Sequence, residues 1–313
     1  MRFCISGYGS IAGFHRDALL AMDGIEIDSV VGRVIEPARE FAKSCGAPLA
    51  TLSLEEALAR PGLDAVLITS PSQVHYEQAA AALRAGKHVL LEIPMALTYA
   101  EAERLCDLAD ERGRTLMICH TQRFWAATIE VKKRIQEGRL TPRQYHVEWH
   151  FFRRENINWM GRQRSWTDNL LWHHGGHVVD HAIWLFGEEP VATRAFYGPS
   201  DNPLGIPLDL SAQLRFPGGG LATYAMSYNA MVTKVTQRVT LICEEDFLVF
   251  EDGRLTDREG KAIAEESHEA AIPRQNREFV ESVREGRAPL TSGREILRSW
   301  KYIDKLERSA RGS

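Results

Sequence analysis

One stretch decides the fold of the first half of this chain: Arg2-Phe3-Cys4-Ile5-Ser6-Gly7-Tyr8-Gly9-Ser10-Ile11-Ala12. Apolar residues over 2–6 predict a strand, and the pattern over 11–22 predicts a helix directly after the two glycines. In a G-x-G-x-x-A turn of this kind, Gly7 permits the tight turn and Gly9 lets a pyrophosphate approach the backbone. The N-terminus of the following helix offers N–H groups to the phosphates. A plain glycine turn is the alternative. We expect a dinucleotide site whose first contacts are Gly7, Gly9, Ser10 and Ile11.

The pattern of side chains changes once along the chain. About the first 120 residues alternate short apolar strands with helical segments, which is typical of a doubly wound parallel sheet. Beyond them, segments such as 144–152, 208–216 and 221–228 alternate polar with apolar side chains, which favours an antiparallel sheet with one open face. The sequence therefore predicts an α/β protein. It has a Rossmann domain over residues 1–121 and, over residues 122–313, an α/β domain with a large, mainly antiparallel open sheet.

Composition and charge exclude several classes of protein. The chain has 313 residues, a formal net charge of −4 and five scattered cysteines without C-x-x-C spacing. This charge disfavours a broad nucleic-acid-binding face, and no apolar run is long enough to cross a membrane. The cysteines predict reduced core residues instead of disulfides or a zinc site, and the first residues show no signal-peptide pattern. We expect a cytoplasmic protein with no nucleic-acid or membrane partner.

The end of the second predicted strand, over residues 25–31, bears on the choice of nicotinamide cofactor. An acidic residue there binds the ribose 2′-hydroxyl of NAD, whereas an arginine accepts the 2′-phosphate of NADP. Val30-Val31-Gly32-Arg33 contains no carboxylate, and the Arg33 guanidinium suits a phosphate. The sequence predicts NADP as the cofactor, with weaker use of NAD. A solvated turn residue is the alternative for Arg33.

Four motifs follow in order along the chain: Ile68-Thr69-Ser70-Pro71-Ser72-Gln73-Val74-His75, Ala85-Gly86-Lys87-His88-Val89-Leu90-Leu91-Glu92-Ile93-Pro94, Gln122-Arg123-Phe124 and Gly175-Gly176-His177-Val178-Val179-Asp180. They resemble Thr-Pro-x-x-x-His, Ala-Gly-Lys-His-Val-x-x-Glu-Lys-Pro, Arg-Phe and Gly-x-His-x-x-Asp of the glucose–fructose oxidoreductase / inositol dehydrogenase (Gfo/Idh/MocA) family. The resemblance implies an oxidoreductase whose second domain often forms the oligomer interface through its open sheet, so we expect a homodimer or homotetramer. The resemblance also implies cofactor contacts at Ser70, Pro71, His75, Glu92, Pro94 and Gln122.

One departure from the family pattern removes its usual proton carrier. The lysine of Glu-Lys-Pro usually polarises or helps to deprotonate the reacting hydroxyl, but this chain has Ile93 there. Isoleucine can neither donate nor accept a proton. Either the acid–base work lies elsewhere, or the protein is a non-catalytic regulator that senses NADP.

Histidines cluster where a helix is expected, near residues 174–186. Helical spacing puts one stripe of side chains together: His173, His177, Asp180 and His181. The resemblance places His177 at the family's acid–base position, and imidazole titrates near neutrality, so His177 is the predicted base. Asp180 is expected to fix its tautomer, with His173 one turn before it. Three alternatives stay open: packing of buried histidines, a zinc site, and a bracing role for Asp180. We expect no metal, since hydride transfer to a nicotinamide needs none.

Arginine and tryptophan side chains gather between the first strand of the second predicted sheet and the histidine segment. Guanidinium groups bind carboxylates in two-pronged fashion, and tryptophan rings stack on flat rings. A small, planar, multiply anionic substrate is therefore expected, although any one of these arginines can instead be a solvated surface residue. The predicted substrate contacts are Arg123, Arg153, Arg154, Arg164 and Trp166.

The missing lysine favours one kind of oxidation. The hydroxyl of a cyclic hemiacetal is more acidic than that of an ordinary alcohol, so a histidine suffices to remove its proton. Within the family, Glu-Ile-Pro and Trp-His-His-Gly-Gly-His resemble a branch that oxidises such a hemiacetal dicarboxylate to a lactone with NADP, during the breakdown of aromatic compounds. A sugar or inositol dehydrogenase is the alternative.

Overall fold

The computed structural model describes residues 1–157, 163, 167 and 169–312. The chain forms two compact units. Unit 1 comprises Met1–Thr121 and Ile272–Leu297, and unit 2 comprises Gln122–Ala271 and Arg298–Ser313. The division by sequence pattern assigns residues 272–297 to the second domain, whereas the structure groups them with the first.

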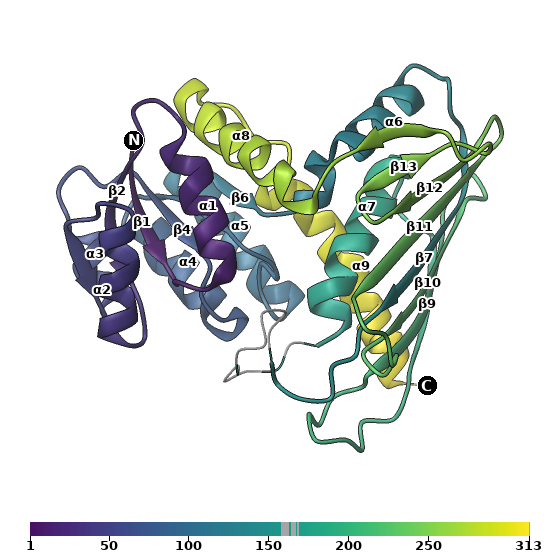
Figure 1. Cartoon of the computed structure of the whole chain (residues 1–313), viewed down its shortest axis with the longest axis horizontal. Helices are drawn as coiled ribbons and strands as arrows, with labels where there is room; N and C mark the ends of the chain where they lie inside the picture. Colours follow the sequence, from purple (N-terminus) through teal and green to yellow (C-terminus); the bar gives the residue numbers. More distant parts are fainter. Residues whose placement is uncertain (158–162, 164–166, 168, 313) are drawn as a thin grey trace. The chain divides into compact units, whose positions relative to one another are not determined.

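Unit 1 is built on a parallel sheet of six strands in the order β3-β2-β1-β4-β5-β6 (Figure 1). The predicted Rossmann sheet is confirmed: β1 pairs in parallel with β2 on one side and with β4 on the other, so the strand order reverses beside β1. Ligands of doubly wound sheets bind at such a reversal. The strands are β1 (Arg2–Ser6), β2 (Glu26–Val31), β3 (Leu49–Thr51), β4 (Ala65–Ile68), β5 (His88–Leu91) and β6 (Leu116–Ile118). The helices are α1 (Ser10–Leu20), α2 (Ile35–Ser44), α3 (Leu54–Leu58), η1 (Ser72–Val74), α4 (His75–Arg84), α5 (Tyr99–Arg112) and α8 (Ile272–Glu285).

Helix α8 joins unit 1 from far along the chain and lies beside α1 (Figure 1). Its buried Phe279 meets the ring of Phe3 in β1, with ring centroids 5.9 Å apart. Asn276 of α8 and the buried His15 of α1 form a hydrogen bond of 2.9 Å across a separation of 261 positions. These long-range contacts are the physical reason why residues 272–297 group with the first unit. The local alternation of strands and helices in the sequence does not predict such contacts.

Unit 2 is built on a sheet of eight strands in the order β14-β13-β12-β11-β7-β10-β9-β8. The predicted open, mainly antiparallel sheet is confirmed, with one parallel pair between β7 and β10. The strands are β7 (Pro142–His150), β8 (Ala192–Tyr197), β9 (Asp209–Arg215), β10 (Leu221–Ser227), β11 (Thr236–Cys243), β12 (Phe247–Glu251), β13 (Arg254–Thr256) and β14 (Ala262–Glu265). The helices and helical turns are η2 (Thr121–Phe124, shared with unit 1), α6 (Ala126–Gln136), η3 (Leu171–Gly175), α7 (Gly176–Phe186), η4 (His268–Ala271) and the second part of α9 (Gly293–Arg311).

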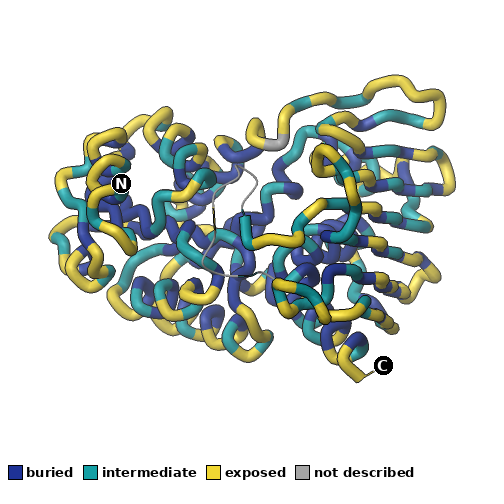
Figure 2. The backbone as a smooth tube through the Cα atoms, turned by 60° about the horizontal axis from the view of Figure 1, so that its bottom comes forward, coloured by how far each residue is buried: buried dark blue, intermediate teal, exposed yellow. Residues whose placement is uncertain are grey.

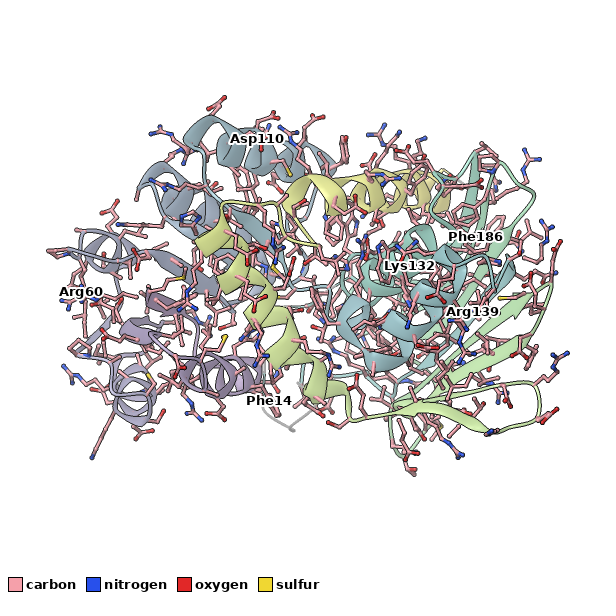
Figure 3. The ribbon with its side chains drawn as sticks, turned by 90° about the horizontal axis from the view of Figure 1, so that it is seen from above. Phe14, Arg60, Asp110, Lys132, Arg139 and Phe186 are labelled. Atoms are coloured by element: carbon pink, nitrogen blue, oxygen red, sulfur yellow. The ribbon has the colours of Figure 1, made fainter. Side chains whose placement is uncertain are left out.

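Helices α6 and α7 lie on one face of the eight-stranded sheet (Figure 1). Side chains along β9 and β10 alternate strictly between buried and exposed or half-buried, which gives the alternating colours of the strands in Figure 2. Lys132 of α6 donates a hydrogen bond to the carbonyl of Trp184 in α7, and Phe186 at the end of α7 stacks on Phe216 at a centroid distance of 4.1 Å. Lys132 and Phe186 are labelled in Figure 3. These contacts fix α7, the helix that carries His177 and His181.

Helix α9 has 19 residues. It begins in unit 1 and ends in unit 2. Throughout the described part of the chain, no helix combines the length and the apolar character that a membrane span requires.

Candidate functional site

The first turn of α1 is open to an anion. Gly9 is the N-cap residue of α1 and has no side chain to cap the helix, and a Cβ at Gly9 would have no atom within 4 Å. Gly7 has a φ of +105°, and a Cβ there would lie 2.6 Å from the backbone carbon of Thr69. The glycines thus allow β1 to run close to the end of β4 and leave space above the N-terminus of α1. Ser10 and Ile11 are the first two residues of that helix. The local geometry suits the pyrophosphate of a dinucleotide.

The end of β2 carries no carboxylate near the helix terminus. Arg33 is exposed just beyond Val31, and Gly32 between them is covered by the ring of Tyr8, because a Cβ at Gly32 would lie 2.3 Å from that ring. Asp28, the carboxylate within β2, is buried and paired with arginine side chains, Arg60 among them, over 2.5 Å. Arg33 is thus an exposed guanidinium directly after β2, and its contact with the cofactor ribose stays a prediction.

His75 joins the two loops that follow β4 and β5. Its ring nitrogens lie 2.8 Å from the carbonyl oxygens of Ser70 and Pro94, and the side chain is buried. Ser70 also donates from its hydroxyl to Gln78 over 2.6 Å. Both nitrogens of His75 are engaged by the backbone, so the ring ties the loops at Ser70-Pro71 and Pro94 together. Its contact with a cofactor stays a prediction.

Glu92 belongs to a small group of titratable side chains within unit 1. Its Oε1 lies 2.8 Å from Nε2 of His15, and Cys119 is also hydrogen-bonded to it. Burial raises the pKa of Glu92, but the hydrogen bond and charge of His15 oppose this, and the net shift of the pKa is downward. Possible ligand atoms of these three side chains lie within 4.8 Å of one another. The next residue, Ile93, is 5 % exposed and presents only hydrocarbon.

The histidine cluster begins in a turn that is wider than an α-helix. Residues Leu171–Gly175 form a π-helical turn, closed by the hydrogen bond from Gly175 N to Leu170 O at 2.9 Å. The side-chain oxygen of Asn169 accepts hydrogen bonds from the N–H groups of Leu171 and Trp172 at the start of this turn. The expected helix near 174–186 is thus α7, Gly176–Phe186, preceded by a π turn that carries His173 and His174.

His177 lies at the second position of α7 and is half-buried, with its ring centroid 6.4 Å from that of Trp149 in β7. His173 is also half-buried, and its ring lies 4.5 Å from that of His174. These side chains belong to unit 2, whereas the dinucleotide motif belongs to unit 1. The roles of His177 as base and of His173 as its neighbour stay predictions.

Asp180 is tied to Arg123 in the interior of unit 2. Nε and Nη2 of Arg123 each donate to one carboxylate oxygen of Asp180 at 2.7 Å, and the Ser299 hydroxyl donates to Oδ1 at 2.7 Å. The side chains of Arg123 and Asp180 are 1 % and 0 % exposed. The expectation that Arg123 contacts substrate is therefore at odds with the structure, because its guanidinium is buried against Asp180. For Asp180 the structure supports the bracing alternative. Gln122 beside Arg123 is buried as well.

His181, the last member of the predicted stripe, belongs to the core. Its Nδ1 lies 2.9 Å from the hydroxyl of Tyr145, and its Nε2 lies 3.2 Å from that of Thr128. Burial lowers the pKa of His181 to about 3, against an ordinary value of 6.5, so its ring is neutral at physiological pH. The stripe therefore divides: Asp180 and His181 stabilise unit 2, and His173 and His177 remain the candidates for proton transfer.

Two of the predicted substrate arginines follow β7 directly. Arg153 is half-buried, with its guanidinium carbon 5.2 Å from the ring centroid of Tyr228. Arg154 is exposed and donates from Nε to the side-chain oxygen of Asn229 at 3.2 Å. Arg164 and Trp166 lie outside the described residues.

Sequence reasoning missed His174 and Tyr228. Nδ1 of His174 lies 2.6 Å from the hydroxyl of Tyr228, and the His174 ring is packed against Phe151 at 4.4 Å. His174 lies directly beside His173 in the sequence, and this position was a signal that could have identified it. Tyr228 follows β10 directly, and β10 pairs with β7, which lies more than 70 positions earlier in the chain, so the local sequence around Tyr228 does not indicate this contact.

Comparison with known proteins places the whole chain in one family. Residues 1–120 match the family described as "Oxidoreductase family, NAD-binding Rossmann fold" (GFO_IDH_MocA). Residues 127–266 match "Bacterial oxidoreductases, C-terminal". The chain is 37 % identical over 313 residues to 4-carboxy-2-hydroxymuconate-6-semialdehyde dehydrogenase of Sphingobium sp., with 98 % of both chains covered.

More distant relatives share parts of the chain or its fold. The scyllo-inositol 2-dehydrogenase (NADP(+)) of Bacillus subtilis is 33 % identical over 202 residues, covering 63 % of this chain and 55 % of that protein. The crystal structure of the WlbA dehydrogenase from Bordetella pertussis, in complex with NADH and UDP-GlcNAcA, superposes with a TM-score of 0.86. Its sequence identity is 24 %, with 100 % of this chain and 97 % of that chain covered, and the likeness shows the fold. From the two matched domains and the full-length relative, we conclude that this chain belongs to the Gfo/Idh/MocA family of oxidoreductases.

Proposed function

We propose that this protein oxidises the cyclic hemiacetal of 4-carboxy-2-hydroxymuconate semialdehyde to 2-pyrone-4,6-dicarboxylate, with NADP as the hydride acceptor. One observation carries the proposal. The relative with that semialdehyde in its name is 37 % identical over 98 % of both chains, and so covers both units at once. The reaction belongs to the 4,5-cleavage route of protocatechuate breakdown, to which we assign this enzyme.

The cofactor site proposed for NADP lies in unit 1. The open N-terminus of α1, with Gly7, Gly9, Ser10 and Ile11, suits the pyrophosphate, and Arg33 suits a 2′-phosphate. When bound, the nicotinamide accepts the hydride that leaves the hemiacetal carbon. The loops at Ser70-Pro71 and Glu92–Pro94, joined through His75, would hold its position.

The proton of the reacting hydroxyl needs an acceptor from this chain. Ile93 is buried hydrocarbon and cannot take it, Asp180 is bound to Arg123, and His181 is a core side chain with a lowered pKa. His177 is half-buried and has an imidazole suited to accept a proton near neutral pH. We assign it as the base. As the hydride leaves carbon, the O–H bond breaks, its electrons form the lactone carbonyl, and the proton passes to the imidazole.

Steady-state rates separate this proposal from its main alternative. Purified protein is supplied with NADP and either the muconate hemiacetal or scyllo-inositol, and NADPH formation is followed at equal enzyme concentration. We expect kcat/KM for the hemiacetal to exceed that for scyllo-inositol by orders of magnitude, with 2-pyrone-4,6-dicarboxylate formed in a 1:1 ratio to NADPH. Faster oxidation of the inositol would reject the substrate proposed here.

An inositol or sugar dehydrogenase is the second candidate. It is favoured by the 33 % identity to scyllo-inositol 2-dehydrogenase (NADP(+)), which covers 63 % of this chain. Two features argue against it. The relative named for the semialdehyde is more similar over a longer alignment, and Ile93 leaves an ordinary alcohol without the lysine of the family.

We also propose that the outer face of the eight-stranded sheet joins copies of this chain into a homodimer or homotetramer. Large apolar side chains are exposed on strands of this sheet, with 51 % exposure for Phe196, 43 % for Leu221 and 40 % for Phe247. Exposed apolar patches on open sheets favour association. Light scattering of the purified protein tests this, and a monomer at micromolar concentration would contradict it.

A further inference from the structure

Among the residues that the structure describes, no charged side chain pairs with one edge of the Arg153 guanidinium. Its Nε is buried and has no hydrogen-bond acceptor among the described residues, and its Nη2 has only a 3.4 Å contact with the side-chain oxygen of Asn156. No carboxylate of the described part of the chain forms an ion pair with it. A buried N–H without an acceptor destabilises the protein, so an arginine kept in this state is suited to an acceptor that arrives from outside.

A second arginine of the same unit shows that the Nε–Nη2 edge of a guanidinium can bind a carboxylate. Arg123 uses its Nε and Nη2 to bind both carboxylate oxygens of Asp180 at 2.7 Å. Those are the same two nitrogens that Arg153 leaves without a close acceptor. Side-on pairing through Nε and Nη2 is a two-pronged geometry that matches a carboxylate better than an amide oxygen or a single hydroxyl.

Tyr228 contacts Arg153 through both its main chain and its ring. The main-chain N–H of Arg153 donates to the main-chain carbonyl of Tyr228 at 2.8 Å. The guanidinium carbon of Arg153 lies 5.2 Å from the centroid of the Tyr228 ring. The hydroxyl of that same tyrosine is 2.6 Å from Nδ1 of His174. Tyr228 therefore fixes the guanidinium through its ring face and the imidazole through its hydroxyl, and a flat ligand at Arg153 would lie beside the histidine segment.

We propose that the Nε–Nη2 edge of Arg153 binds one carboxylate of the dicarboxylate substrate, and that Tyr228 and His174 are the positioning residues of this subsite. The ligand carboxylate would displace the long contact with Asn156 and give Nε its acceptor. The inference rests on the proposed function for the identity of the dicarboxylate, but the recognition chemistry is that of any small, flat dianion.

Binding of two related anions tests this subsite without relying on turnover. Benzene-1,3-dicarboxylate and benzoate are titrated by calorimetry into the protein loaded with NADP, as wild type and as Arg153→Gln. The wild type is expected to bind the dicarboxylate more tightly than benzoate. Arg153→Gln is expected to weaken binding of the dicarboxylate by about 10- to 100-fold and to remove most of that preference, because the contact that distinguishes a second carboxylate is assigned to Arg153.

Matched variants separate recognition from folding. Arg139→Gln alters an exposed arginine of unit 2 whose guanidinium pairs with Glu137, and should leave the preference intact. Arg153→Lys keeps the charge without the two-pronged edge, so it should restore part of the preference lost in Arg153→Gln. Tyr228→Phe keeps the ring but removes the hydroxyl. It should weaken binding of the dicarboxylate by about 3- to 10-fold and have little effect on the binding of benzoate.

Three results would overturn the subsite. They are an unchanged preference in Arg153→Gln, an equal loss for both anions in that variant, and no binding of the dicarboxylate to the wild type. If the wild type oxidises the muconate hemiacetal while Arg153→Gln keeps its preference, the subsite fails and the proposed function stands. If the wild type prefers the dicarboxylate but oxidises only polyols, the proposed function fails and the subsite stands.

Discussion

The change Asp180→Ala removes one half of the buried ion pair of unit 2 and leaves the guanidinium of Arg123 without its carboxylate. The pair consists of two hydrogen bonds of 2.7 Å between side chains that are 1 % and 0 % exposed, with Ser299 as a third donor. Breaking a buried pair by removing one partner destabilises a protein by about 3–5 kcal/mol. For a unit of this size, about 2–4 °C per kcal/mol corresponds to a fall in Tm of roughly 6–20 °C.

Urea unfolding followed by circular dichroism measures this loss, with calorimetric Tm as a second readout. Lys133→Ala, an exposed change in α6, is the control and should stay within about 0.5 kcal/mol of the wild type. The double change Arg123→Met with Asp180→Leu removes both charges and should be less destabilised than Asp180→Ala, since no buried charge is left unpaired.

The variant Asp180→Ala also distinguishes a bracing role of Asp180 from a role in the reaction. If Asp180 braces the helix, refolded Asp180→Ala at low temperature keeps much of its turnover per folded molecule. A stability loss below about 1 kcal/mol, together with a large loss of turnover, would refute the bracing role and return Asp180 to the reaction.

Four further predictions concern the cofactor site and the core. Arg33→Ala should raise the Kd of NADP by about 10-fold or more in fluorescence titration while that of NAD changes little, and equal losses for the two cofactors would contradict the role of Arg33. Gly7→Ala should lower both Tm and NADP affinity, because the new Cβ would lie 2.6 Å from the backbone of Thr69. Gly9→Ala, whose Cβ meets no atom within 4 Å, should keep the wild-type Tm and weaken only the binding of NADP. Undiminished NADP binding would show that no pyrophosphate approaches Gly9. The pKa of His181 is about 3 in the folded protein against an ordinary 6.5, so the unfolded chain takes up this proton first as pH falls. Stability should therefore fall by up to about 1.4 kcal/mol per pH unit from pH 6.5 towards 3. Urea titrations at several pH values, compared with His181→Gln, measure this slope, and an identical slope in the variant would assign it to other groups.

Local sequence pattern predicted the two sheets because each has a short-range signature. The strand–glycine–helix run at Arg2–Ala12 and the alternating side chains of β9 and β10 both appear in the structure as expected. The return of Ile272–Leu297 to unit 1 depends on contacts such as Phe3 with Phe279, and such contacts leave no periodic trace in the chain.

Part of the histidine segment could be singled out from the sequence, but the contacts of its residues could not. Helical spacing grouped His177, Asp180 and His181 on one stripe, and spacing alone cannot tell which of them meets a buried partner. Asp180 accepts a hydrogen bond from Arg123, 57 positions away, and His181 is hydrogen-bonded to Tyr145, 36 positions away. The π turn before α7 also escapes prediction, because its 5-residue hydrogen bond depends on packing and not on a known sequence motif.

The most direct measurement of the central claim is the rate of NADPH formation from the muconate hemiacetal by the wild type and by His177→Ala, each with its NADP affinity determined in parallel. Because Ile93 cannot carry a proton, we predict that His177→Ala lowers kcat by about 10²–10⁴-fold while NADP binding is unchanged. Wild-type turnover with unchanged kcat in His177→Ala would contradict the account, since the proton would then leave through another group.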